Sequence, residues 1–594
     1  MSNYRKLSDD EVAQLERQGN RCDDWRAVQV AGAFCADCLR DNTFYGTVLL
    51  GAIVRRTTSY GDLTLREGIC RSTLANVTVG DHPVIHNVQM LSGYVLGEGV
   101  TLVNVEEMTC TADPHAVAWM EPMNENGGRR LLPFSGMTIG DAYLWARYRG
   151  RLRLMERLES FTYDSLNSPE GSYGRVGDHA VVKNTKALHN IVIRSSADDR
   201  TVVDGCTVLS DGVVGYGCTL QHGVIAVRFL LGEHVHLEFG LRLNDSVVGD
   251  NSTLARCEVG NSIVFPAHEQ HHNNSFLIAA LVMGQSNIAA GGTIGSNHNS
   301  RTADGEIAAG RGFWPGLCCS FKHSSRFASY CLLAKADYPA ELDIRLPFAL
   351  VNNNGSQDRL EVMPAYWWMY NMYAMDRNSH KFAGRDKRVR KAQHIEFAAL
   401  APDTAEEILH GMSLLRTWLD ASTDGTVYAD GMEKSTRPTV ILKAKEGLKA
   451  YEDMLVCYAM KSIDSDTCPQ PPASYPAKWV NIGGQLVAEK DMEKLIADIE
   501  SGIIGSWDAV HARFDALWEA YPAQRKAHAY SVLCRLAGTD RIDDTQWQHF
   551  RQRYADIQAY IEEQKVTSRH KDDVNTFRNM TYWDDAERDA VMST

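Results

Sequence analysis

Four histidines lie close together in one polar stretch of the sequence: His268, His271, His272 and His298. Asparagines, glycines and small residues surround them between residues 265 and 301. A neutral imidazole has an ordinary pKa of about 6.5, so a histidine in this stretch could serve as a general base at neutral pH. Imidazole nitrogens are also good ligands for zinc, and a buried histidine often only satisfies polar groups at an irregular turn. The residue types leave three roles open: acid–base catalysis, metal binding and structure.

In an enzyme, the catalytic base of this stretch would be His272 or His298, with His271 as the third candidate. Amides beside a base can orient a substrate, and guanidinium or ammonium groups can bind a phosphate. If a metal is bound instead, its expected ligands are His268, His271, His272 and His298. The predicted substrate-binding residues are Asn273, Asn297, Asn299, Arg301, Lys322, His323 and Arg326.

The residues before the histidines repeat with a period of six. A glycine often follows the repeating aliphatic residue, as in Val214-Gly215 and Leu231-Gly232. A chain that turns a corner every six residues has this pattern, with one aliphatic side chain pointing inward on each side and glycine, asparagine or aspartate at the corner. Such coils bury their apolar faces only when they stack, which predicts a β-solenoid. The repeating aliphatic residues are Val202, Val208, Val214 and Leu220, then after a slip Leu231, Leu237 and Leu243.

The histidine stretch begins directly after a regular part of the repeat, which reads "EVGNSIVF". We expect the stretch to break the repeat and to form a loop or an irregular coil at the surface. Binding residues tend to collect on such segments.

Other parts of the chain differ in periodicity. Apolar residues recur at helical spacing between residues 137 and 165, and we expect that face to pack on the solenoid or on a partner subunit. The basic run 384–391 is expected to pair with acidic residues of a helical C-terminal domain, and the alternative is contact with the phosphate groups of a nucleotide. The predicted segments are an N-terminal helical segment (1–38), a first β-helix block (39–136), an inserted helix (137–170), a second β-helix block with the histidines (171–350), an aromatic and basic connector (351–394) and a helical C-terminal domain (395–594).

The six-residue pattern resembles the hexapeptide-repeat superfamily, whose fold is the left-handed parallel β-helix. The whole chain also resembles a large hexapeptide-repeat family of unknown function, known mainly from Bacteroides-type bacteria. The resemblance implies a mainly β fold with added α structure: an interrupted left-handed parallel β-helix, an inserted helix and a helical C-terminal domain. The matching motifs are "YRKLSDDEVAQLERQGNRCDDW", "NENGGRRLLPFSGMTIGDAYLWARYRGR", "HHNNSFLIA", "SNHN" and "DDAERDAV".

The resemblance also implies a transferase that acts on a sugar, a sugar phosphate or a sugar nucleotide. In superfamily members that transfer acyl groups, a histidine removes a proton from a sugar hydroxyl or amine, which attacks an acyl-CoA thioester. A γ-carbonic-anhydrase-like branch binds zinc with three histidines, so a metal-dependent hydrolase or lyase is a third hypothesis, although the spacing here differs from that branch. The alternative from another class is a non-enzymatic ligand-binding or scaffold protein. The cofactor stays open between acyl-CoA, a nucleotide and zinc.

Composition and charge limit the cellular location and the partners expected for the protein. The chain has 594 residues and a formal net charge of −14, which argues against nucleic acid as a partner. No apolar run reaches the roughly 18 residues that span a bilayer, and the first residues lack the apolar core of a secretory signal. The 14 scattered cysteines fit a reducing compartment. We expect a cytoplasmic protein with no membrane partner, forming a homo-oligomer (dimer or trimer) through apolar faces of the coils and the inserted helix.

Overall fold

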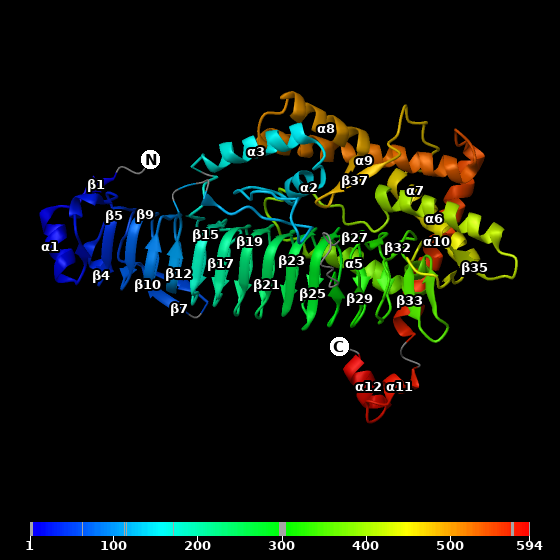
Figure 1. The fold of residues 1–594 in the computed structure, drawn as a ribbon, viewed down its shortest axis with the longest axis horizontal. Helices are drawn as coiled ribbons and strands as arrows, with labels where there is room; N and C mark the ends of the chain where they lie inside the picture. Colours follow the sequence, from blue (N-terminus) through cyan, green and yellow to red (C-terminus); the bar gives the residue numbers. More distant parts are fainter. Residues whose placement is uncertain are drawn as a thin grey trace.

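The computed structural model describes residues 4–61, 63–111, 113, 116–169, 171–295, 305–571 and 575–592. A long parallel β-solenoid forms one side of the molecule, and helices from the middle and the end of the chain lie along it (Figure 1). The predicted fold class is confirmed: a parallel β-helix is interrupted by a helical insertion and followed by a helical C-terminal region.

Each regular coil of the solenoid takes 17 residues, because Val208 pairs with Ile225 and Ile225 pairs with Arg242. Consecutive inward side chains are spaced by six, five or six residues, as from Leu220 to Ala226, Leu231 and Leu237, all of them buried. One side of the triangular coil is therefore one residue shorter than a six-residue repeat would make it.

The short side explains where the six-residue prediction is wrong. Val202 and Val208 are half-buried, and the inward positions of that coil belong to Val203 and Leu209. A strict step of six loses register by one residue per coil, and neighbouring strand residues point to opposite faces.

The predicted use of asparagine at the corners is confirmed. Asn87, Asn104 and Asn184 adopt left-handed backbone angles, with φ of 57°, 55° and 53°. Their side-chain amides form a ladder: Asn87 donates to Asn104 at 3.0 Å and Asn104 donates to Asn184 at 3.2 Å. Asparagine tolerates this backbone region because its short amide can hydrogen-bond locally.

The N-terminal segment contains a helix but already belongs to the solenoid, because β2 and β3 both pair with β5 in parallel. The hairpin of β6 and β7 projects from this block. The N-terminal elements are β1 (Arg5–Lys6), α1 (Asp9–Arg17), β2 (Arg21–Cys22), β3 (Val28–Val30), β4 (Leu39–Arg40), β5 (Thr43–Leu50), β6 (Thr57–Tyr60), β7 (Leu63–Arg66), β8 (Gly68–Cys70), β9 (Thr73–Val79), β10 (Val84–Ser92), β11 (Val95–Leu96) and β12 (Thr101–Thr109).

The second block continues the same stack after the insertion, since β12 pairs with β14 and β15. Its strands are β13 (Arg175–Val176), β14 (Val181–Lys183), β15 (Ala187–Ile193), β16 (Val202–Asp204), β17 (Val208–Val214), β18 (Thr219–Gln221), β19 (Ile225–Leu231), β20 (His236–Glu238), β21 (Arg242–Val248), β22 (Thr253–Ala255), β23 (Cys257–Val264), β24 (Glu269–Gln270), β25 (Ser275–Val282), β26 (Thr293–Ile294), β27 (Ile307–Ala309), β28 (Trp314–Pro315), β29 (Ser320–Phe321), β30 (Arg326–Phe327), β31 (Leu332–Leu333), β32 (Asp343–Ile344) and β33 (Leu350–Asn354).

The insertion holds two helices, α2 (Ile139–Arg147) and α3 (Leu152–Leu166), where one helix was predicted. They pack on the outside of the solenoid together with α8 and α9 of the C-terminal region (Figure 1). This confirms that the apolar face of the insertion packs on the solenoid. The outward side chains beneath these helices are Val192, Val213, Leu230, Val247, Ile263 and Leu281.

The C-terminal region is anchored to the solenoid by buried charges: Arg311 is 2% exposed, and its Nη2 donates to Asp403 Oδ1 at 2.8 Å. An extended segment, residues 386–401, crosses from the solenoid to this region, and we call it the strap. The remaining elements are β34 (Arg359–Met363), α4 (Tyr366–Tyr370), α5 (Met372–Arg385), α6 (Pro402–Ala421), β35 (Val427–Ala429), β36 (Thr439–Ile441), α7 (Ala444–Ile463), β37 (Trp479–Ile482), β38 (Gln485–Ala488), α8 (Glu489–Ser501), α9 (Trp507–Ala537), α10 (Asp544–His570), α11 (Thr576–Asn579) and α12 (Asp585–Met592).

The structure also bears on the cysteines and on membrane-spanning helices. All 14 cysteines are free, and half of them are fully buried. Within the described ranges, no helix combines the length and the apolar composition needed to cross a membrane.

Candidate functional site

Residues 265–295, the described part of the histidine stretch, stay in the solenoid and form an irregular coil, one of the two forms predicted from sequence. Glu269 pairs with Thr253 of the preceding coil, and Ser275 pairs with Cys257. Residues 271–274 therefore form only a corner between β24 and β25. Parallel pairing resumes at β25 because Ser275 follows Cys257 by 18 residues, close to a normal coil, whereas the next coil is longer and Ala280 pairs with Ile307.

His268 is sealed inside the coil, with no exposed surface. Its Nδ1 lies 2.8 Å from Ser286 Oγ and its Nε2 lies 3.2 Å from Gln270 Oε1. Burial lowers the pKa of His268 to about 4, so the ring is neutral. Both ring nitrogens are used within the core, which is the structural role of a satisfied buried polar group.

His271 and His272 lie at the corner, with ring centroids 4.5 Å apart. His272 and Asn273 are exposed, whereas His271 is half-buried and lines a cleft beneath α5. Of the predicted site residues, Asn297, His298, Asn299 and Arg301 lie outside the described residues. In the part of the chain that is described, no group of three or more His, Cys, Asp or Glu side chains could hold a metal ion.

The predicted residues of the following coils are not brought into that cleft. Lys322 is half-buried, His323 is buried, and Arg326 is exposed and paired with Asp343 at 2.7 Å. None of these three lines the cleft that contains His271. Of the predicted site residues that the structure describes, His271 alone lines this cleft.

A larger groove, of about 850 Å³, lies between the solenoid and the segments that cover it. This volume is within the usual range for small-molecule sites, about 300–1,000 Å³. Four parts of the chain form its walls: a row of solenoid corners, the insertion on both sides of α2 and α3, the strap at Ala392, and the first turn of α9.

His511 on α9 faces this groove and is held by a buried carboxylate. Its Nε2 lies 2.7 Å from Oδ2 of Asp141, which has no exposed surface. Burial disfavours the imidazolium, but the charge and the hydrogen bond of Asp141 outweigh it, so the pKa of His511 is raised. Because Asp141 occupies Nε2, the neutral ring carries its proton there and presents the lone pair of Nδ1.

Local helix geometry fixes both members of this pair. Asp141 is the third residue of α2 and accepts the backbone N–H of Thr138 at 2.8 Å, which completes a capping box. α9 begins at Trp507, whose Nε1 donates to Thr162 Oγ1 of α3 at 2.9 Å. The indole of Trp507 stacks on Phe134 with centroids 5.2 Å apart, so the insertion locks the first turn of α9 in place.

The solenoid side of the groove supplies positive charge. Arg175 and Arg194 both line it, and neither guanidinium has a hydrogen-bond or ion-pair partner among the residues described here. Arg194 lies over the ring of Tyr216, with its Cζ 4.5 Å from the ring centroid, and Arg390 of the strap lies over the same ring at 3.7 Å. Stacking orients a guanidinium while leaving its N–H groups available to an anion.

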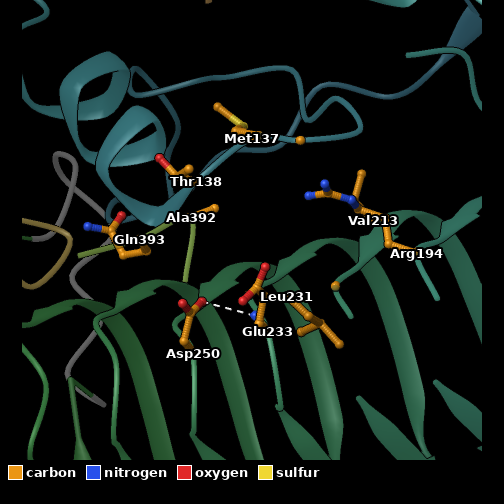
Figure 2. Close-up of a pocket in the computed structure, with 12 residues that line it drawn as sticks. Met137, Thr138, Arg194, Val213, Leu231, Glu233, Asp250, Ala392 and Gln393 are labelled. Atoms are coloured by element: carbon orange, nitrogen blue, oxygen red, sulfur yellow. Dashed lines mark hydrogen bonds between the residues drawn. The ribbon is translucent and has the colours of Figure 1, made fainter. Parts of the chain in front are cut away.

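The inner end of the groove is a small cavity of about 20 Å³ that shares Gly136, Arg194 and Ala392 with it. Figure 2 shows Glu233 and Asp250 on the solenoid there, below Met137 and Thr138 of the insertion. The backbone N–H of Glu233 donates to Asp250 Oδ1 at 3.0 Å. Burial and the charge of Asp250 raise the pKa of Glu233 to about 7.

The strap closes this end by pairing with solenoid carboxylates. Arg388 is 4% exposed, and its guanidinium donates to Asp250 and Asp386. The backbone N–H of Val389 donates to Asp199 Oδ2 at 3.2 Å. The basic run was predicted to pair with the helical domain, and this is wrong: its main partners lie on the solenoid, because the run crosses the coils before any C-terminal helix begins.

Corner glycines make room for the groove. A Cβ at Gly215 would overlap the carbonyl oxygen of Gly232, and one at Gly232 would overlap the carboxylate of Asp250. Neither glycine has a positive φ, so close approach between coils, and not an unusual turn, requires them. The two glycines therefore let neighbouring coils approach closely along this edge.

Two comparisons place the chain among known sequences. A family model described as "Domain of unknown function (DUF4954)" matches residues 4–419. The chain belongs to the DUF4954 family. An "Uncharacterized protein" of Treponema pallidum (strain Nichols) is 42% identical over 653 aligned residues, which cover 100% of this chain and 90% of the relative.

The residues of the groove lie partly inside the DUF4954 match and partly after it. Asp141, Arg175 and Arg194 lie inside residues 4–419, and His511 lies beyond it but within the region aligned with the relative. Sequence reasoning missed all four residues. The only local signal is the capping box of Thr138 and Asp141, which marks the helix but does not reveal a histidine 370 residues away.

Proposed function

We propose that the groove binds a sugar phosphate or sugar nucleotide and that the protein transfers a group, with His511 as general base, to a hydroxyl or amine of that ligand. The observation that carries this proposal is the His511–Asp141 pair facing an 850 Å³ groove that also presents Arg175 and Arg194. The proposal moves the predicted histidine chemistry from the corner at 271–274 to α9 and treats the solenoid as a hexapeptide-repeat fold.

The proton-transfer step uses groups that the structure brings together. Nδ1 of His511 takes the proton from the attacking hydroxyl, and the buried carboxylate of Asp141 stabilises the imidazolium that forms. The freed oxygen attacks the acyl carbon of an acyl thioester, the carbon–sulfur bond breaks, and the thiolate leaves with the proton that His511 holds. Asp141 also prevents the ring from turning away, because the capping box fixes the carboxylate.

The two guanidinium groups support an anionic substrate. A buried or half-buried guanidinium with no partner is costly unless a ligand supplies the negative charge. Arg–phosphate contacts are charge-assisted and often bidentate, which gives orientation as well as affinity. Tyr216 keeps Arg194 at the groove wall, so an anion bound there would hold the rest of the sugar near His511.

The test is a binding and turnover experiment on the full chain. Glucose 1-phosphate, UDP-glucose and acetyl-CoA are titrated by calorimetry, and acyl transfer is followed by thiol release. Arg194→Ala should weaken binding of the phosphate ligand about tenfold, the equivalent of about 1.4 kcal/mol. His511→Ala should leave binding nearly unchanged and lower turnover by about 10²–10⁴-fold. Arg242→Ala, an exposed cation of the solenoid outside the groove, is the matched control.

The outcomes separate the hypotheses. Unchanged turnover in His511→Ala would show that His511 is not the general base. Ligand binding without any turnover would favour the non-enzymatic ligand-binding protein. Unchanged phosphate affinity in Arg194→Ala would show that the groove is not the binding site.

The proposal keeps the expectation of a cytoplasmic homo-oligomer. Free cysteines support a reducing compartment. The outward apolar row of the solenoid is covered by the chain's own helices, so a dimer or trimer would use another surface. Light scattering on purified protein gives the mass that tests this.

A further inference from the structure

A second cavity, of about 460 Å³, lies between the solenoid and α5. The solenoid contributes Glu269, Asn287 and Trp314, and α5 contributes a row of basic side chains. This cleft lies outside the groove, with which it shares no lining residue. Among the described residues, His271 is the one predicted site residue that lines it.

The basic row comes from one face of α5. Arg377, Lys381 and Arg385 are each four residues apart, so they lie one above the other on the side turned to the cleft. A helix rises about 1.5 Å per residue, so the three charges extend over roughly 12 Å. A single phosphate covers only part of that length, whereas a chain of two or three phosphates matches it.

One carboxylate faces the three cations. Lys381 Nζ and Arg385 Nη1 donate to the two oxygens of Glu269 at 2.6 and 2.7 Å. Arg377 has no hydrogen-bond or ion-pair partner in the described part of the protein. In a chain with a net charge of −14, the cleft therefore concentrates positive charge that the protein does not neutralise.

The other walls suit a phosphate-bearing ligand. Burial and the neighbouring His272 lower the pKa of His271, so its neutral ring can accept or donate one hydrogen bond. Trp314 packs against Trp367 with ring centroids 5.5 Å apart, which gives the cleft a rigid aromatic side. Asn287 adds an amide at the floor.

We propose that the cleft beneath α5 is a second anion site, which binds an extended di- or triphosphate chain along Arg377, Lys381 and Arg385. The site is independent of the groove and of the transfer reaction proposed there. The same chemistry is found in inorganic polyphosphate and in the phosphate chain of a nucleotide, and the aromatic wall is the feature that could distinguish them.

Calorimetry with orthophosphate, inorganic tripolyphosphate and ATP tests the proposal on the full chain. Tripolyphosphate should bind at least tenfold more tightly than orthophosphate. If ATP binds more tightly than tripolyphosphate, the source is a nucleotide. If the two bind equally, the phosphate chain alone is recognised. Equal and weak binding of orthophosphate and tripolyphosphate would overturn the site.

Two variants move the affinity in opposite directions. Arg377→Ala should weaken tripolyphosphate binding about tenfold, and it should fold normally because Arg377 is exposed and unpaired. Glu269→Gln should strengthen binding several-fold, because it frees Lys381 and Arg385 for the ligand. The double variant Arg194→Ala/His511→Ala should leave tripolyphosphate binding unchanged. The proposal would be contradicted if tripolyphosphate binding is unchanged in Arg377→Ala or is lost in the double variant.

Discussion

The groove and the cleft beneath α5 lie on the same solenoid but are built in different ways. The groove is enclosed by several distant segments, which are joined by buried pairs such as Arg388–Asp250 and His511–Asp141. The cleft is covered by one helix, which is attached to Glu269 by the half-buried Lys381 and the exposed Arg385. A regular coil has flat walls, and these two cavities form where other segments of the chain lie across the coil.

This difference indicates which of the two cavities has a rigid shape and which can change its shape. Breaking a buried charge pair leaves an unpaired charge in a medium that cannot solvate it, whereas surface pairs contribute little. We therefore expect the groove to be preorganised and the cleft to open easily by motion of α5.

The largest effect is expected for Arg388→Ala, which should lower the free energy of unfolding by about 3–5 kcal/mol. The buried carboxylate of Asp250 would lose its counter-ion, and the strap would lose its main attachment to the solenoid. Arg385→Ala is the matched control in the cleft, because its side chain is 63% exposed, and should cost less than about 1 kcal/mol. Urea unfolding of both variants measures the difference. Equal losses would mean that the two coverings are not distinct.

A smaller effect, of about 1–3 kcal/mol, is expected at the inner end of the groove. Burial and Asp250 raise the pKa of Glu233 to about 7, so the folded protein disfavours its charged form. The wild type should lose stability as the pH rises from about 4.5 through about 7, and Glu233→Gln should lack this loss and be the more stable protein at pH 8.

The control is Glu258→Gln, whose side chain lies on the exposed face of β23. It should leave the pH dependence of unfolding as in the wild type. If Glu233→Gln follows the wild-type curve from pH 5 to pH 8, Glu233 does not carry the linkage.

The sequence was sufficient for the architecture because the architecture repeats. Leu231, Leu237 and Leu243 fall at inward positions, and glycines follow at the corners as expected. The coil length of 17 residues was not recognised from the sequence, because a side of five residues resembles an interruption of a six-residue period. Because of this error, Val202 and Val208 were predicted to point inward, whereas Val203 and Leu209 do so in the structure.

The sites could not be read in the same way, because each depends on contacts between coils or between segments. His268 bonds to Ser286 of the next coil, so its role is set by a neighbour 18 residues away. Nothing in the local sequence distinguishes it from His271, which lines a cleft. Asp141 precedes the second β-helix block in the sequence, and His511 follows it. Their helices, α2 and α9, come together because both pack on the outward apolar row of the solenoid.

The pKa of His511 is expected to be lower in Asp141→Asn than in the wild type. The amide still accepts the hydrogen bonds but lacks the charge that raises the pKa of His511. A raised histidine pKa adds stability below the ordinary value, and this is lost as the pH rises through the folded value. The variant should therefore be less stable than the wild type at pH 5.5 and closer to it at pH 8. An NMR titration of the His511 ring protons measures the shift directly, and an unchanged titration would mean that Asp141 does not tune the base.

The smallest effect is expected for His272→Ala, which should change the free energy of unfolding by less than about 0.5 kcal/mol. His272 is exposed, and its ring lies 4.5 Å from the ring of His271, centroid to centroid. If the groove is the reactive site, turnover in His272→Ala should match the wild type while His511→Ala loses it. If His272→Ala loses turnover and His511→Ala keeps it, the histidine corner is the base after all. The catalytic centre would then lie beside the cleft, α5 would be its cover, and the preorganised groove would have only a binding role.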